Sequence, residues 1–201
     1  ANAYDKAIEL QPKLGEPYIN RAKLYLNDKK LDEAYKLLIT ASRNDPSNYI
    51  APILAADILA KQEKYEDAIA MYEKMLARNP DVHAAANNMA DIISNQFYDN
   101  SQMMEKARLV AERFISSSNP LLLDTLAWVY YRQGKVQQAL TIIQRAMAVK
   151  TELPAGVYYH YGKILYDVGS KDAAKAELQK AVDSKEEFEG KKDAEKLLKL
   201  I

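Results

Sequence analysis

Cysteine is absent from the 201-residue sequence, which excludes disulfide bonds and thiolate metal sites. Glycine occurs only six times, mostly between stretches of helical periodicity, and the alternating runs of β-branched residues that predict strands are missing. The two histidines, His83 and His160, have no spacing that would hold a metal ion. Apolar residues recur instead at i, i+3, i+4 and i+7, so the sequence predicts an all-α protein without a metal centre.

An excess of either charge is also lacking, because 28 basic residues balance 28 acidic ones. A nucleic-acid-binding domain usually carries a basic face, and a neutral chain has no general attraction to anionic lipid. No apolar run approaches the roughly 18 residues that a membrane helix needs, and no signal peptide is visible. We therefore expect a protein or peptide partner, no nucleic acid and no direct membrane insertion by this segment.

A fixed interval organises the residues that are present. Pro12, Pro46 and Pro80 recur every 34 residues, and Ala34 and Ala68 are separated by the same distance. A constant period in this range is typical of a repeat array, in which each unit packs only on its neighbours. The sequence therefore predicts stacked units instead of one wound core.

The repeated pattern of small residue, Tyr or Leu, Ala, aromatic or aliphatic residue and Pro resembles the tetratricopeptide repeat, a helix–turn–helix unit. The resemblance implies a right-handed α-solenoid of stacked antiparallel helix pairs with a C-terminal capping helix. It divides a single solenoid over residues 1–201 into a truncated half repeat at 1–14, repeats at 15–48, 49–82, 83–119, 120–154 and 155–188, and a capping helix at 189–201.

Small residues at matching positions support this register. They are Ala22, Ala56, Ala90, Ala127 and Gly162 on the first helices, and Ala34, Ala68, Ala107, Ala139 and Ala174 on the second. The third unit departs from the period, because about five residues are inserted around Asn95–Gln102. Such an insertion favours either a functional loop near Phe97 and Tyr98 or an extra turn on the first helix.

The resemblance also implies which residues face a partner, since the inner wall of such arrays is built mainly by the first helices. Carrying the family's inward positions onto this sequence gives a candidate binding set: Asn87, Asp91, Asn95, Asp124, Trp128, Tyr131, Arg132, Tyr159, Lys163 and Tyr166. Trp, Tyr and Arg are enriched at binding hot spots. The alternative is that the rings pack between units or against the capping helix, and that the polar residues line a solvated groove.

Catalytic motifs are missing. The sequence has no glycine-rich phosphate loop and no G-x-S-x-G turn, and the carboxylate pairs Glu66/Asp67 and Glu186/Glu187 lie on charged, solvated stretches. We expect His160 to be a hydrogen-bonded surface or groove histidine without an acid–base role. The sequence therefore predicts neither an enzyme nor a cofactor.

The favoured interpretation is a protein-interaction scaffold that binds a peptide or a partner domain in its concave groove. Residues 123–132 and 188–191 resemble the C-terminal ends of bacterial tetratricopeptide proteins, so one alternative is an accessory segment of an envelope secretion or exopolysaccharide-export system. Another is a regulatory array of a larger enzyme, since the chain opens inside a helical pattern and we expect a fragment. A cysteine-free chain suits either bacterial periplasm or cytoplasm, the periplasm being slightly favoured, and the oligomeric state is left open.

Overall fold

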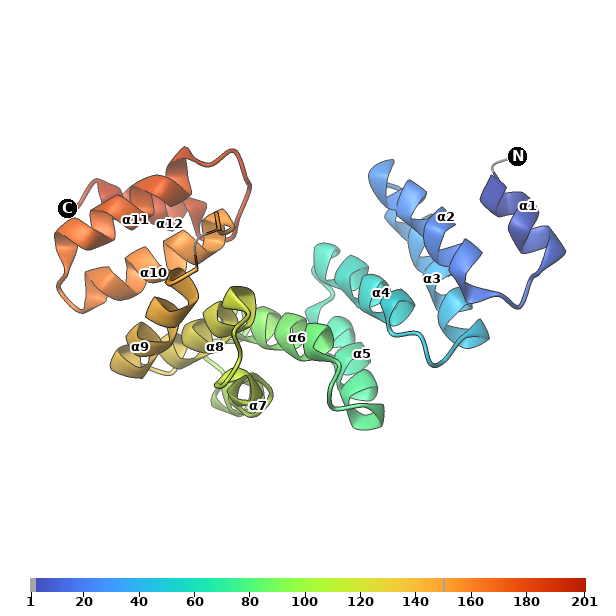
Figure 1. Ribbon diagram of the computed structural model, residues 1–201, viewed down its shortest axis with the longest axis horizontal. Coiled ribbons are helices and arrows are strands. Elements are labelled where there is room, and N and C mark those ends of the chain that lie inside the picture. The colour runs from blue at the N-terminus through green and yellow to red at the C-terminus, as the bar shows by residue number, and fades with distance from the viewer. Residues whose placement is uncertain (1–2, 150) are drawn as a thin grey trace. The chain divides into compact units, whose positions relative to one another are not determined.

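The computed structural model describes residues 3–149 and 151–201, and within them it contains helices joined by short turns and no strand (Figure 1). In chain order the elements are α1 (Ala3–Leu10), α2 (Gly15–Asn27), α3 (Leu31–Asn44), α4 (Ile50–Lys61), α5 (Tyr65–Arg78), α6 (His83–Gln96), α7 (Ser101–Ala111), the short 3₁₀ helix η1 (Glu112–Phe114), α8 (Pro120–Arg132), α9 (Val136–Met147), α10 (Ala155–Asp167), α11 (Lys171–Asp183) and α12 (Lys191–Leu198). The prediction of an all-α helical repeat fold is confirmed.

The chain forms two compact units, Ala1–Ile92 and Ile93–Ile201, with the boundary inside α6. The expectation of one solenoid over the whole chain stays a prediction, and each unit is described by itself. In the first unit α2 packs on α3 and α4 on α5, while α3 packs on α4. Ala22 and Ala34 are fully buried where α2 and α3 meet, together with Leu38. Small side chains thus let these helices approach closely, as the register predicts.

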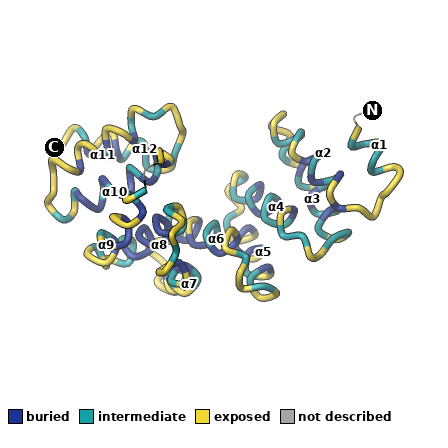
Figure 2. Tube along the Cα trace, in the orientation of Figure 1, coloured by how far each residue is buried: buried dark blue, intermediate teal, exposed yellow. Residues whose placement is uncertain are grey.

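The second unit repeats this arrangement. Here α8 pairs with α9 and α10 with α11, and α12 packs on both α11 and α10. Figure 2 shows α8 buried along much of its length, and every residue from Leu123 to Tyr130 belongs to the buried class. Gly162 of α10 lies against Leu178 of α11 so closely that an added Cβ would fall 2.7 Å from the Leu178 Cγ. The helix pair therefore depends on a glycine at this position.

A residue in the left-handed backbone conformation follows the first helix in four of the helix pairs. Lys29, Glu63, Gly134 and Gly169 have φ values of +58°, +60°, +74° and +84°. Backbone hydrogen bonds close the same turn each time, for example from Lys30 N–H to the Tyr25 carbonyl at 2.8 Å. This is the Schellman ending, which uses a positive φ to reverse the chain and satisfy the last carbonyls. The repeated turn explains why the helices of these four pairs fold back on one another.

The inserted residues of the third unit belong mostly to a helix. α7 begins at Ser101, three residues before Met104, which occupies the slot where α3, α5 and α9 begin at Leu31, Tyr65 and Val136. The Asn100 side chain caps α7 by accepting hydrogen bonds from the backbone N–H groups of Gln102 and Met103. Neither alternative given for the insertion is correct: only residues 97–100 separate α6 from α7, so no long loop forms, and the added residues mostly precede Met104 in the second helix, α7, instead of adding a turn to the first.

Candidate partner-binding surface

The predicted binding residues of the first unit, Asn87 and Asp91, lie on α6 beside a polar network. Asp57 of α4 accepts hydrogen bonds from the Tyr72 hydroxyl and from Asn88 Nδ2, the latter at 2.9 Å. Burial, reinforced by the Asp57 carboxylate, raises the pKa of Tyr72 above its usual value. Asn87 Nδ2 donates to Asn88 at 3.4 Å, whereas its Oδ1 is buried without a partner among the described residues. This network ties α4, α5 and α6 together, and Asp91 is exposed at its edge.

Trp128 is a core residue of the second unit. Its side chain is 1% exposed, and its indole N–H donates to Asn95 Oδ1 at 2.7 Å. The His160 ring stacks on the indole with centroids 3.9 Å apart, and the Tyr131 ring stacks on it at 4.9 Å. An indole enclosed in this way offers almost no area to a partner. The alternative given above, that the ring packs inside the array, therefore describes Trp128.

His160 and Asp124 form a buried pair beside this indole. Nδ1 of His160 lies 2.9 Å and 3.1 Å from the two carboxylate oxygens of Asp124, and each residue is 8% exposed. His160 is thus a hydrogen-bonded histidine, as expected, but it is buried instead of lying on the surface. Asp124, predicted to contact a partner, is held inside the unit by this histidine, and its carboxylate is not presented at the surface.

The C-terminal segment covers Tyr159. Its ring is 5% exposed and lies 5.8 Å from the Phe188 ring, and its hydroxyl donates to Asp193 Oδ2 at 3.1 Å. Gly190 has a φ of +95°, and a Cβ there would come 2.2 Å from the Tyr159 ring, so only glycine fits this crossing. Burial first, and then the Asp193 carboxylate, raise the pKa of Tyr159. Tyr159 therefore packs against the segment that leads into α12.

Lys163 is engaged by the same segment, because its Nζ lies 3.0 Å from Asp193 Oδ2. Tyr166 packs at the edge of the same core cluster and keeps part of its surface exposed. Gln96 of α6 also contacts the segment by donating to Glu189 at 2.8 Å. These contacts fix the position of residues 186–193 over α10.

Arg132 and its neighbours form the exposed part of the predicted site. The guanidinium carbon of Arg132 lies 4.6 Å from the ring centroids of both Trp128 and Tyr98. Tyr98 is 53% exposed, and Tyr131 and Arg132 are partly exposed. Within the described ranges Arg132 has no ion-pair partner, and its Nε–H, which is buried, lacks an acceptor. We call Tyr98, Tyr131 and Arg132 the Arg132 surface. The candidate set omitted Tyr98, whose only sequence signal was its place in the insertion.

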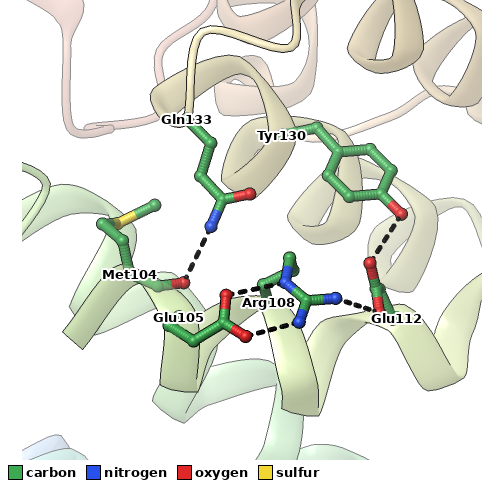
Figure 3. Close-up of polar contacts among 6 residues, drawn as sticks. All are labelled: Met104, Glu105, Arg108, Glu112, Tyr130 and Gln133. Atoms are coloured by element: carbon green, nitrogen blue, oxygen red, sulfur yellow. Dashed lines mark hydrogen bonds and ion pairs between the residues drawn. The ribbon is translucent and has the colours of Figure 1, made fainter. Parts of the chain in front are cut away.

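Polar contacts between α7 and α8 hold the helix that carries this surface (Figure 3). Arg108 bridges Glu105 and Glu112 along α7 and η1, and the Tyr130 hydroxyl donates to Glu112 at 3.2 Å. Gln133 Nε2 donates to the Met104 carbonyl at 3.2 Å at the end of α8. Because these bonds join neighbouring elements on both sides of Arg132 in sequence, they restrict the rotation of α8 about its axis. The hydroxyl of Tyr131 in turn donates to Asp167 of α10 at 2.6 Å.

No cluster of His, Asp and Glu that could hold a metal ion occurs in residues 3–149 and 151–201. In the same ranges every helix is too short or too polar to cross a bilayer.

Comparison with protein families gives matches to models of the tetratricopeptide repeat at residues 19–83, 53–93, 122–153 and 155–188, together more than half of the chain. No curated protein sequence matches significantly. Among solved structures, the chain is similar to YrrB, described as a tetratricopeptide repeat protein with an unusual peptide-binding site. That match has 20% identity and a TM-score of 0.64, and covers 97% of this chain and 98% of YrrB.

Two further structures show the same fold. A thermophilic protein of this type from Thermus thermophilus matches at 15% identity with a TM-score of 0.71, covering 92% of this chain and 98% of the other. A repeat protein from Parabacteroides merdae matches at 22% identity with a TM-score of 0.64, covering 98% and 74%. At these identities the likeness establishes the fold.

Proposed function

Because this chain belongs to the tetratricopeptide repeat family, we propose that it is a non-catalytic scaffold that binds a peptide or a partner domain. The fold alone does not define a partner, so the proposal depends on a particular surface. In the second unit that surface is the Arg132 surface. Asn95, Lys163 and Tyr166 stay predicted contacts in the second unit, and Asn87 and Asp91 stay predicted contacts in the first, whereas Trp128, Tyr159 and Asp124 are buried inside the second unit.

The observation that carries the proposal is the state of the Arg132 guanidinium. It lies against two aromatic rings and has no carboxylate partner among the described residues, although most buried or half-buried polar groups in proteins are satisfied. Stacking fixes its orientation, and a fixed guanidinium forms strong, directed hydrogen bonds with a carboxylate or carbonyl oxygen. The exposed face of Tyr98 adds apolar contact area beside it. We infer that a peptide carboxylate or backbone carbonyl binds here.

A peptide-display selection on the full chain tests this proposal. Peptides enriched on the wild-type chain are counted again on two variants, Arg132→Gln and Lys192→Gln. Lys192 is an exposed lysine at the start of α12, so the control removes the same charge elsewhere in the same unit. We expect enrichment to disappear with Arg132→Gln and to persist with Lys192→Gln. Equal enrichment on both variants would show that the Arg132 surface is not the binding site.

The two alternatives stated above place the same scaffold in a larger context. The complete gene distinguishes them, because a lipobox at its start supports an envelope assembly, whereas an appended catalytic domain supports a regulatory array.

A further inference from the structure

A pocket of about 410 Å³ lies in the first unit, between α3, α4 and α5. Volumes of this size are typical of sites that hold a side chain or a small ligand. Its lining includes Tyr35, Ile39 and Arg43 of α3 and Met71, Lys74 and Arg78 of α5, and residues 46–52 close one end. It lies on the second helices of the pairs, so it is separate from the surface proposed above.

The spacing of these residues shows that two helices present matching stripes to the pocket. Tyr35, Ile39 and Arg43 are four residues apart along α3. On α5, Met71, Lys74 and Arg78 are three and four residues apart. Residues at these intervals share one face of a helix. Each stripe therefore has an apolar part, followed by cations towards the C-terminal end of its helix.

The charge of the pocket is entirely positive. Arg43, Lys74 and Arg78 line it, and none of its described lining residues is acidic. All three cations are exposed, and none forms an ion pair within residues 3–149 and 151–201. Arg43 and Arg78 lie in the last turns of α3 and α5, where the helix dipole favours positive charge. The pocket thus concentrates uncompensated positive charge on a chain whose net charge is zero.

In the second unit the cationic residue at the position equivalent to Lys74 is hydrogen-bonded within the unit. Alignment of Ala68 with Ala139 puts Lys74 in register with Arg145. Arg145 donates to the carbonyls of Ile115 and Ser117 at 2.7 Å and 3.3 Å, which ties α9 to the turn that follows η1. Lys74 makes no such bond to any described residue. Lys74 is therefore unpaired among the described residues, whereas the cation in register with it is bonded within the second unit.

We propose that this pocket binds a short acidic segment of a partner protein, with one large apolar side chain inserted against Ile39 and Met71. Carboxylates flanking that side chain would pair with Arg43, Lys74 and Arg78, as charge complementarity requires. Methionine suits such a floor because its flexible thioether adapts to the inserted group. A polyanion without apolar groups would leave this floor unused, which favours an acidic peptide with an apolar side chain over a purely polar polyanion.

Fluorescence anisotropy of labelled, amidated peptides with the full chain tests the inference. The probe is Glu-Glu-Phe-Glu-Glu, compared with a version in which Gly replaces Phe and with Lys-Lys-Phe-Lys-Lys. The protein variants are Arg43→Gln with Arg78→Gln, and the matched control Lys36→Gln with Lys61→Gln, which removes two exposed charges from α3 and α4 outside the pocket. All four positions are exposed, so both variants should fold, which circular dichroism checks.

We expect saturable binding of the acidic peptide, weakened at least about fivefold by the Arg43/Arg78 variant and less than about twofold by the control. Loss of Phe should weaken binding about tenfold or more, because the ring buries apolar area. The inference is overturned by absence of saturable binding, by equal affinity of the two variants, or by equal affinity of the Gly or Lys peptides. Preferential binding of an oligonucleotide or of phosphatidylserine vesicles through Arg43 and Arg78 would overturn it as well.

Discussion

At the scale of single residues, one tryptophan determines how the second unit is organised. Trp128 joins α8 to Asn95 of α6 through its N–H and to His160 of α10 through its ring, so three helices meet on one side chain. The aromatic residue expected to meet a partner is instead what fixes Arg132 and Tyr131 at the surface. We therefore expect substitution of Trp128 to affect mainly stability, and substitution of its neighbour Arg132 on the same helix to affect mainly binding.

Replacement of Trp128 by Ala should lower the free energy of unfolding by about 3–5 kcal/mol, because it empties a large buried volume and removes the indole N–H that donates to Asn95. Replacement of the exposed Tyr98 by Ala should change it by no more than about 0.5 kcal/mol. Urea denaturation followed by circular dichroism measures both. A small effect of Trp128→Ala would contradict the assignment of this ring to the core.

Three tyrosines with a raised pKa should make the stability of the fold decline at alkaline pH. Burial raises the pKa of Tyr159, Tyr131 and Tyr72 above the ordinary value of about 10. Because the pKa is raised in the folded state, the unfolded chain loses these protons first as the pH rises. The contribution of the three tyrosines to the free energy of unfolding is therefore complete below pH about 10 and declines at higher pH. Thermal melts from about pH 8 to about 11 should show this decline, and Tyr159→Phe should reduce it. An unchanged pH profile in that variant would contradict the assignment for Tyr159.

At the scale of helices and turns, the turn that reverses the chain between paired helices uses different residue types in the two units. Gly134 and Gly169 adopt positive φ freely, whereas Lys29 and Glu63 adopt it with a side chain. The left-handed region costs a residue with a Cβ about 1–2 kcal/mol, and glycine loses part of that advantage through its greater freedom in the unfolded chain. The turns of the first unit therefore retain strain that those of the second avoid.

Substitution of Glu63 by Gly should raise the free energy of unfolding by about 0.5–1 kcal/mol, since it relieves the turn after α4 without removing a described contact. The reciprocal change, Gly134→Ala, should destabilise by a similar amount although open space surrounds the glycine. Chemical denaturation of both variants measures the difference. Destabilisation by Glu63→Gly would show that the glutamate has a role beyond its backbone conformation.

Close packing of α10 on α11 gives a second prediction at this scale. A methyl group at Gly162 would fall 2.7 Å from Leu178 Cγ and 3.1 Å from the Leu178 backbone nitrogen, and the second contact cannot be relieved by a rotamer change. Gly162→Ala should therefore cost about 1–3 kcal/mol despite the better helix propensity of alanine. An additional Leu178→Ala substitution should recover little, because the backbone contact remains. Differential scanning calorimetry of the single and double variants tests this.

The sequence predicted the helix pairs well because the determinants are local. Ala22, Ala34 and Gly162 carry their meaning in their spacing, and all three are buried where two helices meet. The binding residues were harder to predict, since exposure depends on what lies above a residue. Tyr159 occupies an inward position of the family, yet residues 188–193 cross it, and no periodicity foretells the path of that segment.

At the scale of the molecule, the chain is electrically neutral, but its charge is distributed unevenly. The first unit places three unpaired cations around one pocket, and the second places an unpaired guanidinium between two rings. A scaffold that recognises partners through such local features needs no net charge. The family accounts for the stacking of the helices, and we propose that these few exposed side chains select the partner.

The most direct test of this account uses Trp128 as its own reporter, because it is the single tryptophan and the Arg132 guanidinium lies over its ring. A peptide selected on the wild-type chain is titrated while tryptophan emission is recorded. We predict a saturable change in intensity with an emission maximum that stays blue-shifted, and its loss in Arg132→Gln but not in Lys192→Gln. The same titration curve in Arg132→Gln and in the wild-type chain would contradict the account.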